Sequence, residues 1–208
     1  MSSILHIRAV SHELPAFAAR LEALGIDSLS LRQMTDEHFA GRSAILVEGH
    51  VDQRALLAHR DALRRHLDAG GTLVFNGHLV YPIFDGLADF VVAPRRGVKE
   101  LEVERVNPHP VFDGVDCHDL SYRRGVAGFY ARGANPPPPD AVVLHRLRVD
   151  GSPIDWVWQR PDGGQVFMHS GNNLWMYIND DTSAARIAPQ LLDWVRAGAP
   201  AAIYPEQE

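Results

Sequence analysis

Residues 44–78, AILVEGHVDQRALLAHRDALRRHLDAGGTLVFNGH, contain the pattern that decides the fold class. Two apolar runs, at 44–47 and 72–75, lack the alternation of a half-exposed strand. Continuous runs of this kind are typical of parallel strands that are covered on both faces. Between them, Asp52 can cap a helix in which three leucines share one face. The stretch therefore predicts a strand, a helix and a parallel strand joined by a right-handed crossover.

The residues upstream extend the same alternation of strand and helix. A short apolar stretch at 4–10 predicts a strand, and residues 28–31 predict another. Between them, apolar residues recur every three or four positions over 14–24, which predicts an amphipathic helix. The first half thus predicts an α/β protein with a flavodoxin-like three-layer sandwich, in which a mostly parallel sheet is covered by helices.

The second half adds strands of a different kind. Residues 101–106 alternate apolar and charged side chains, which indicates a half-exposed strand. The dipeptide Asp150-Gly151 is a strong hairpin signal. Further strands are predicted at 141–149, 154–158 and 165–169, a surface loop at the proline-rich residues 135–139, and a final helix at 184–195. We therefore expect added antiparallel strands within a single domain spanning residues 1–208.

Composition excludes several classes of protein. The net charge of -6 gives no electrostatic support to a nucleic-acid partner. No apolar stretch is long enough to span a bilayer, and the N-terminus lacks the pattern of a signal peptide, so we expect a cytoplasmic protein without a membrane partner. A single cysteine excludes an internal disulfide and a multi-cysteine metal centre. No cofactor is predicted, because dinucleotide and phosphate-loop motifs are absent.

Polar and ionisable residues follow three of the predicted strands. In an open parallel sheet, ligands bind at the carboxyl ends of the strands, so these clusters are expected to converge. For chemistry, His78 or His169 would serve as a general base or a metal ligand, with Glu48 as its partner. Ligand binding is assigned to His50, Asn76, Gly77, Asn172 and Asn173. The alternative is structural: the glycines serve tight turns, and the histidines form a hydrogen-bonded pair beneath a loop.

Four short segments carry a resemblance to a known family: residues 52–53, 70–75, 109–115 and 164–167. In their order along the chain they resemble the class I glutamine amidotransferase-like superfamily. Within it, they look most like its trehalose-utilisation (ThuA-like) branch. The resemblance implies the same α/β fold and leaves open a carbohydrate or another polar metabolite as ligand.

The nucleophile of that superfamily is missing. Its active members carry a cysteine at a sharp turn after a central strand, whereas the matching turn here, residues 75–79, has neither Cys nor Ser at its tip. His169 is also not followed by the glutamate of the family pattern. Cys117 is flanked by aspartates, which raise a thiol pKa, and Ser170 lacks the glycine pattern of a nucleophile elbow. Glutaminase activity is therefore rejected, and whether the chain is an enzyme stays open.

Two functions remain after this exclusion. The first is a non-glutaminase domain that binds a small polar ligand at the strand ends, without a metal site, since no close histidine spacing exists. The second is a catalytically inert binding or assembly subunit that forms a homodimer through apolar surfaces and through Trp156 and Trp158. These tryptophans share one strand face, where they could alternatively stack on a sugar or pack against a helix.

Overall fold

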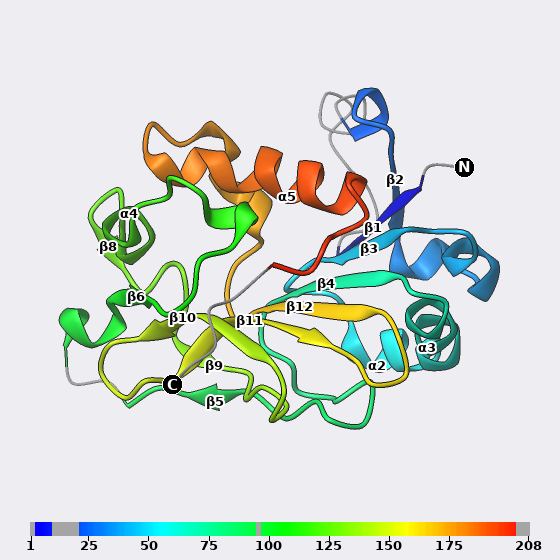
Figure 1. Ribbon diagram of the computed structural model, residues 1–208, viewed down its shortest axis with the longest axis horizontal. Helices are drawn as coiled ribbons and strands as arrows, with labels where there is room; N and C mark the ends of the chain where they lie inside the picture. Colours follow the sequence, from blue (N-terminus) through cyan, green and yellow to red (C-terminus); the bar gives the residue numbers. More distant parts are fainter. Residues whose placement is uncertain (1–2, 10–20, 95–96, 203–208) are drawn as a thin grey trace.

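A computed structural model describes residues 3–9, 21–94 and 97–202 (Figure 1). Its main sheet has eight strands in the order β2-β1-β3-β4-β12-β11-β10-β6. The first five strands in this order run parallel, and the last three are added antiparallel. Their bounds are Ile4–Arg8 (β1), Ile26–Ser30 (β2), Ala44–Val47 (β3), Thr72–Asn76 (β4), Val103–Arg105 (β6), Val142–Leu147 (β10), Pro153–Gln159 (β11) and Gln165–His169 (β12). The predicted mixture of a parallel core and antiparallel additions is confirmed.

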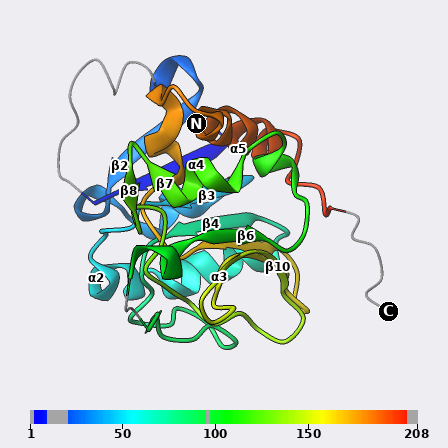
Figure 2. The ribbon, with the colours of Figure 1, turned by 90° about the vertical axis from the view of Figure 1, so that its left-hand side faces the viewer.

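Helices cover both faces of this sheet, giving three layers (Figure 2). On one face, Leu46 and Val74 pack in a core with helix α5, Ile187–Arg196. Their neighbours in the strands, Ile45 and Leu73, point the other way. They pack with α2, Gln53–Leu57, and α3, Arg60–Asp68. Because successive side chains of a strand alternate between faces, the continuous apolar runs supply both cores.

The helix predicted after Asp52 is two helices. Asp52 does cap α2, since its Oδ1 accepts hydrogen bonds from the backbone N–H groups of Arg54 and Ala55, both at 3.1 Å. The chain then breaks at Ala58 and His59 before α3 begins. In the predicted helix at 14–24, Leu14 and Phe17 lie outside the described residues. The predicted strand at 101–106 is shorter because residues Val98–Leu101 form the 3-10 helix η3.

Short elements occupy the connections between the strands and helices of the main layers. They are β5 Val91–Val92, β7 Tyr122–Arg123, β8 Val126–Ala127, β9 Gly133–Ala134, α4 Cys117–Ser121, and the 3-10 helices η1 Leu31–Gln33, η2 Asp36–Phe39, η4 Pro110–Phe112, η5 Leu174–Asn179 and η6 Ser183–Arg186. Strands β5 and β9 pair with each other outside the main sheet, as do β7 and β8. Among these connections, residues 128–132 between β8 and β9 border the site described below.

The two tryptophans of β11 belong to the core. Trp156 is fully buried and Trp158 is 7% exposed. The indole N–H of Trp156 donates to the carbonyl of Asn135 at 2.8 Å. The proline-rich segment is thus anchored against the sheet at Asn135, which is itself buried, and is not wholly a surface loop. Of the alternatives for these tryptophans, a dimer surface is wrong, because both side chains pack in the core that also contains Leu79, Ile83 and Leu87.

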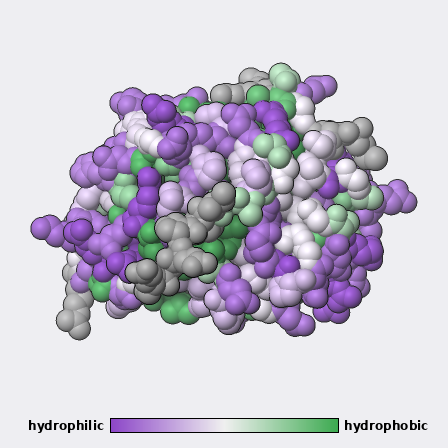
Figure 3. All heavy atoms as spheres, viewed as in Figure 1, coloured by the Kyte–Doolittle hydropathy of each residue, from purple (hydrophilic) through white to green (hydrophobic). Residues whose placement is uncertain are grey.

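Among the helices of the described residues, none has the length and apolarity required to cross a membrane. The face of the molecule seen in Figure 3 is mostly hydrophilic, with its hydrophobic residues gathered near the middle, over β10 and β11. The exposed large hydrophobic residues with more than half of their surface accessible are Val80, Val91, Val92 and Val126.

Candidate functional site

Three glycines form the turns at which β3, β4 and β12 end: Gly49, Gly77 and Gly171. A β-carbon on Gly77 would lie 2.5 Å from the carbonyl oxygen of Gly49, and the φ of Gly77 is +99°. A β-carbon on Gly49 would come within 3.3 Å of the Cα of Gly77 and 3.4 Å of the carbonyl oxygen of Gly171. The three turns therefore lie in backbone contact, which requires residues without side chains. Their bare backbone leaves room for a ligand to approach the sheet edge closely.

A cavity of about 610 Å³ lies over these glycines. It is lined by residues from the ends of β3, β4 and β12 and by the loop before β9: Gly49, His50, Val51, Gly77, His78, Gly128, Phe129, Tyr130, Ala131, Arg132, Gly171 and Asn172. Four of the predicted site residues are among them, namely His50, Gly77, His78 and Asn172. The segment 128–132 was not predicted to contribute.

His78 presents its imidazole at this cavity. The ring is exposed and stacks on Phe90, with 3.7 Å between ring centroids and 15° between planes. Partial burial lowers the pKa of His78, and the nearby positive groups His50, His169 and Arg132 lower it further. A neutral imidazole at neutral pH can accept a proton from a ligand, which is the property required of a general base.

Arg132 and Asn172 add polar groups to the same cavity. The Nε of Arg132 donates to the carbonyl of Gly128 at 2.9 Å, which leaves the ends of its guanidinium for a ligand. The side-chain amide of Asn172 donates to the carbonyl of Phe129 at 2.8 Å, so its oxygen is available as an acceptor. Of the described residues that line the cavity, none carries a carboxylate.

His169 lies behind the glycine floor and not on its surface. Its side chain is fully buried, and its Nδ1 lies 2.6 Å from Oδ1 of Asp155. Oδ2 of the same carboxylate lies 2.9 Å from Nδ1 of His145 and accepts a hydrogen bond from the Tyr130 hydroxyl at 2.7 Å. Within the described ranges of the chain, the Nε2 of His169 has no hydrogen-bond partner. It lies 2.8 Å from the position that a β-carbon of Gly171 would occupy.

Asp155 is the centre of this buried network. Burial by itself would raise the pKa of Asp155, but positive charge on His169 and the hydrogen bonds from His145 and His169 outweigh it, so the pKa lies well below its usual range. Burial and the Asp155 charge raise the pKa of Tyr130 well above its usual value. The carboxylate is therefore charged and the phenol neutral, and the phenol remains a hydrogen-bond donor.

Sequence reasoning missed Asp155, although a signal existed. In the β11–β12 ladder Asp155 pairs with His169, and in the β10–β11 ladder it pairs with His145. Three ionisable residues thus occupy opposing positions on three neighbouring strands. Register counting from the predicted hairpin at Asp150-Gly151 could have placed Asp155 near His145.

Glu48 does not partner His78 or His169, contrary to the prediction. Its Oε1 lies 3.2 Å from Nε2 of His6, and its Oε2 accepts the backbone N–H of Ala9 at 2.7 Å. Burial opposes ionisation of Glu48, but the contacts with His6 and Ala9 outweigh it and lower the pKa of the carboxyl. The carboxylate therefore binds His6 in β1 and the backbone just after this strand.

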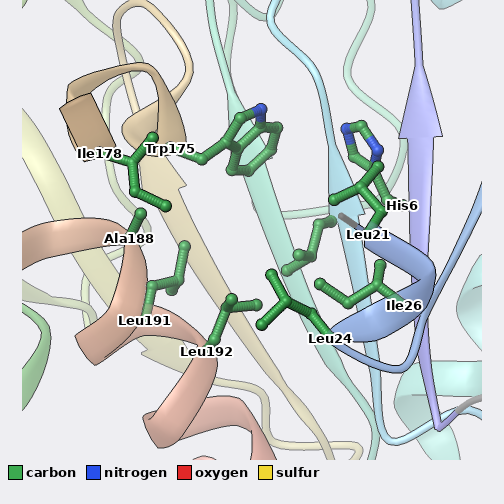
Figure 4. Close-up of a pocket in the computed structure, with 10 residues that line it drawn as sticks. His6, Leu21, Leu24, Ile26, Trp175, Ile178, Ala188, Leu191 and Leu192 are labelled. Atoms are coloured by element: carbon green, nitrogen blue, oxygen red, sulfur yellow. The ribbon is translucent and has the colours of Figure 1, made fainter. Parts of the chain in front are cut away.

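His6 also borders a second, smaller cavity of about 50 Å³ (Figure 4). Apart from His6, its lining is apolar: Leu21, Leu24, Ile26, Leu46, Trp175, Ile178, Ala188, Leu191 and Leu192. Figure 4 shows the labelled apolar side chains directed toward one another from α5, from η5, from the segment before β2 and, for Ile26, from β2 itself. Leu14 and Phe17, which are predicted to share a helical face with Leu21 and Leu24, lie outside the described residues. We assign this cavity to the packing of α5 and η5 against the sheet.

Asn76 and Asn173 hold the strand ends together. The side-chain amide of Asn76 donates to the carbonyl of Val47 at 2.9 Å, and its oxygen accepts the N–H of Leu174 at 3.1 Å. The side-chain oxygen of Asn173 accepts the N–H of Gly49 at 2.7 Å. Neither residue lines the 610 Å³ cavity. Their contacts fix the turns that form its floor.

Neither of the two alternative nucleophiles is in a position to react. Ser170 is fully buried, and its hydroxyl accepts the N–H of Asn135 at 2.9 Å. Cys117 begins α4, away from the glycine turns, and burial raises the pKa of its thiol. Within the described part of the chain, no three His, Cys, Asp or Glu side chains are grouped so that they could hold a metal ion.

The chain matches no protein-family model and no curated protein. Its structure is similar to that of the cytoplasmic protein STM3548 from Salmonella typhimurium, with a TM-score of 0.57 and 12% identity over 92% of this chain and 98% of the other. It is also similar to the mmIFT52 N-terminal domain, with a TM-score of 0.55 and 17% identity over 92% and 96%. A GMP synthase-like protein from Thermoplasma acidophilum has a TM-score of 0.53 and 8% identity over 93% and 94%. At these identities the likeness concerns the fold alone.

Proposed function

We propose that this chain is a non-glutaminase domain of the amidotransferase-like fold that binds a small polar metabolite at the carboxyl ends of β3, β4 and β12. The observation that carries the proposal is the cavity over Gly49, Gly77 and Gly171, which is lined by His50, His78 and other hydrogen-bonding groups. Ligands in open α/β sheets bind at this edge. The volume of about 610 Å³ is that of a site for a small molecule.

The likeness to the GMP synthase-like protein supports the fold in this proposal and not the activity. The turn after β4 carries His78 where a glutaminase needs its nucleophile, so acyl transfer through a thiolate is excluded from the proposal. The short segments that resemble ThuA-like proteins place a carbohydrate derivative first among candidate ligands. A cytoplasmic location is part of the same proposal, as is the absence of nucleic-acid and membrane partners.

The residues divide into two roles within the proposal. His78, Asn172 and Arg132 contact the ligand, and His78 is the group that accepts a proton if a reaction occurs. His169 and Asp155 act from beneath the floor, because Gly171 separates His169 from the cavity. They are positioning residues that hold the turn after β12 against the turn after β4, where the carbonyl of His169 accepts the N–H of Gly77 at 2.9 Å.

A thermal-shift screen against sugars, sugar phosphates, amino acids and divalent metals tests the proposal. A ligand at 100 times its dissociation constant stabilises a fold by about 2.7 kcal/mol, which raises Tm by roughly 5 °C for a chain of this length. We expect a shift of that size, lost in both His78→Ala and Asn172→Ala. A shift that persists in both variants would place the ligand elsewhere and contradict the proposal.

The second candidate function is an inert assembly subunit that forms a homodimer. The observation in its favour is that both side chains of β5 are exposed, Val91 at 57% and Val92 at 61%. The buried Trp156 and Trp158 cannot take part in such an interface. Light scattering on the wild type and on Val91→Glu distinguishes the candidates. A dimer that Val91→Glu converts to a monomer supports assembly, and a monomeric wild type excludes it.

A further inference from the structure

We infer that the ligand carries a negatively charged group, a phosphate or a carboxylate, which Arg132 binds at the mouth of the cavity. The inference rests on the proposed binding function and names the chemical class of its ligand. It follows from the basic side chains around the cavity and from the absence of a carboxylate among the described residues that line it.

Three basic groups, two histidines and one arginine, come from different parts of the chain. His50 follows β3, His78 follows β4, and Arg132 precedes β9, yet all three line one cavity. They are near enough for His50 and Arg132 to disfavour a proton on His78, and His169 acts on His78 in the same way from beneath the floor. An anion bound beside Arg132 would favour the protonated form of His78, because an opposite charge stabilises a cation.

Arg132 has no carboxylate partner among the described residues, unlike Arg123 and Arg160. Arg123 forms an ion pair with Asp180 at 2.5 Å, and Arg160 forms one with Asp68 at 2.9 Å. Within the described residues Arg132 forms no ion pair, and its hydrogen bond goes to a backbone carbonyl through Nε. Its remaining N–H groups form the fork that binds carboxylate and phosphate oxygens in pairs.

The position of these groups also argues for recognition of a ligand. The whole chain has a net charge of -6, whereas the described residues that line the cavity include basic side chains and no carboxylate. The backbone of the glycine turns forms the floor, which allows an anion to approach without meeting a β-carbon. Asn172 adds an amide that can bind the uncharged part of the same molecule.

Isothermal titration of three matched compounds tests the inference: glucose 6-phosphate, gluconate and glucose. We expect at least one of the two anions to bind about tenfold more tightly than neutral glucose, as expected for a charge-assisted hydrogen bond. The affinity of the anion should rise as the pH falls from about 8 to about 6 and be accompanied by proton uptake, because a bound anion favours the protonated form of His78.

Arg132→Gln should weaken binding of the anion about tenfold or more and leave binding of a neutral ligand unchanged. Arg60→Gln is the matched control, since it removes the same charge from an exposed position on α3 outside the cavity. Equal loss in both variants would show attraction by overall charge and overturn the inference.

The outcomes separate this inference from the proposed function. Binding of neutral compounds with no preference for an anion, lost in His78→Ala, would keep the binding function and overturn the anionic ligand. Failure of these three compounds and of every compound in the screen described above would overturn both. A preference for phosphate over carboxylate, or the reverse, identifies which anion the fork of Arg132 accepts.

Discussion

Two groups of histidines lie near the same edge of the sheet, and they differ in burial and in hydrogen-bond partners. His169 and His145 share the carboxylate of Asp155 with Tyr130, and all four side chains are at most 1% exposed. His50 and His78 are exposed, and neither forms a side-chain hydrogen bond within the described residues. The difference teaches that a histidine at a strand end becomes structural when a neighbouring strand supplies a carboxylate, and remains available to a ligand when it does not.

The largest effect should come from breaking the buried network at its centre. Asp155→Ala leaves two imidazoles and a phenol without their acceptor in the core, so we expect a loss of about 3–5 kcal/mol in the free energy of unfolding. Urea unfolding measures it. Asp162→Ala, at an aspartate whose side chain is 84% exposed, is the control and should change stability by less than about 0.5 kcal/mol. Equal stability of the two variants would show that the network does not stabilise the fold.

Another buried histidine, His109, should make the protein sensitive to acid. Burial lowers the pKa of His109 to about 4, below the ordinary value of 6.5. The folded state therefore binds this proton more weakly than the unfolded state does. The contribution of neutral His109 to the free energy of unfolding is complete above pH 6.5 and is lost as the pH falls toward 4. The shift corresponds to about 3 kcal/mol.

His109→Asn isolates this contribution, because the asparagine oxygen can still accept the N–H of Val111, as Nδ1 of His109 does at 3.3 Å. Unfolding measured between pH 4 and pH 7 should show a pH dependence that is smaller by about 3 kcal/mol in the variant. An unchanged pH dependence would mean that His109 can be protonated in the folded protein.

The floor of the open cavity should be sensitive to a single methyl group. Gly77→Ala combines a positive φ with a β-carbon 2.5 Å from the carbonyl oxygen of Gly49, so we expect a loss of about 2 kcal/mol or more. Gly151→Ala separates the two causes, since Gly151 has a φ of +73° but no atom within 4 Å of the added carbon. It should lose only about 1 kcal/mol. Equal losses would show that the contact with Gly49 costs nothing.

Much of the fold could be predicted from the sequence, because continuous apolar runs identify buried parallel strands. The predicted strands at 44–47 and 165–169 have the observed bounds of β3 and β12. The break between α2 and α3 was not visible, since Ala58 and His59 are compatible with a continuous helix. The exposed tryptophan surface failed for a different reason: alternation gives the face of a side chain but not whether a loop covers that face.

The candidate site could be predicted in part. The glycine and histidine turns were found because the ends of adjacent parallel strands must meet. Glu48 was given the wrong partner, since a side chain at a strand end can turn toward either neighbouring strand, and β1 supplies His6. Arg132 was missed because its loop has no periodic pattern. Register counting from the hairpin brings Asp155 only to within one residue of His145, and a bulge in β10 makes the two direct partners.

The distinction between the two groups of histidines is tested most directly by urea unfolding of His78→Ala and His169→Ala, measured side by side. His78 is exposed and stacks only on Phe90, so its replacement should change the free energy of unfolding by less than about 1 kcal/mol. His169 is fully buried against Asp155, so its replacement should cost several times as much, about 3 kcal/mol or more. Equal losses in the two variants, or a larger loss in His78→Ala, would contradict the division into a sealed network and an open site.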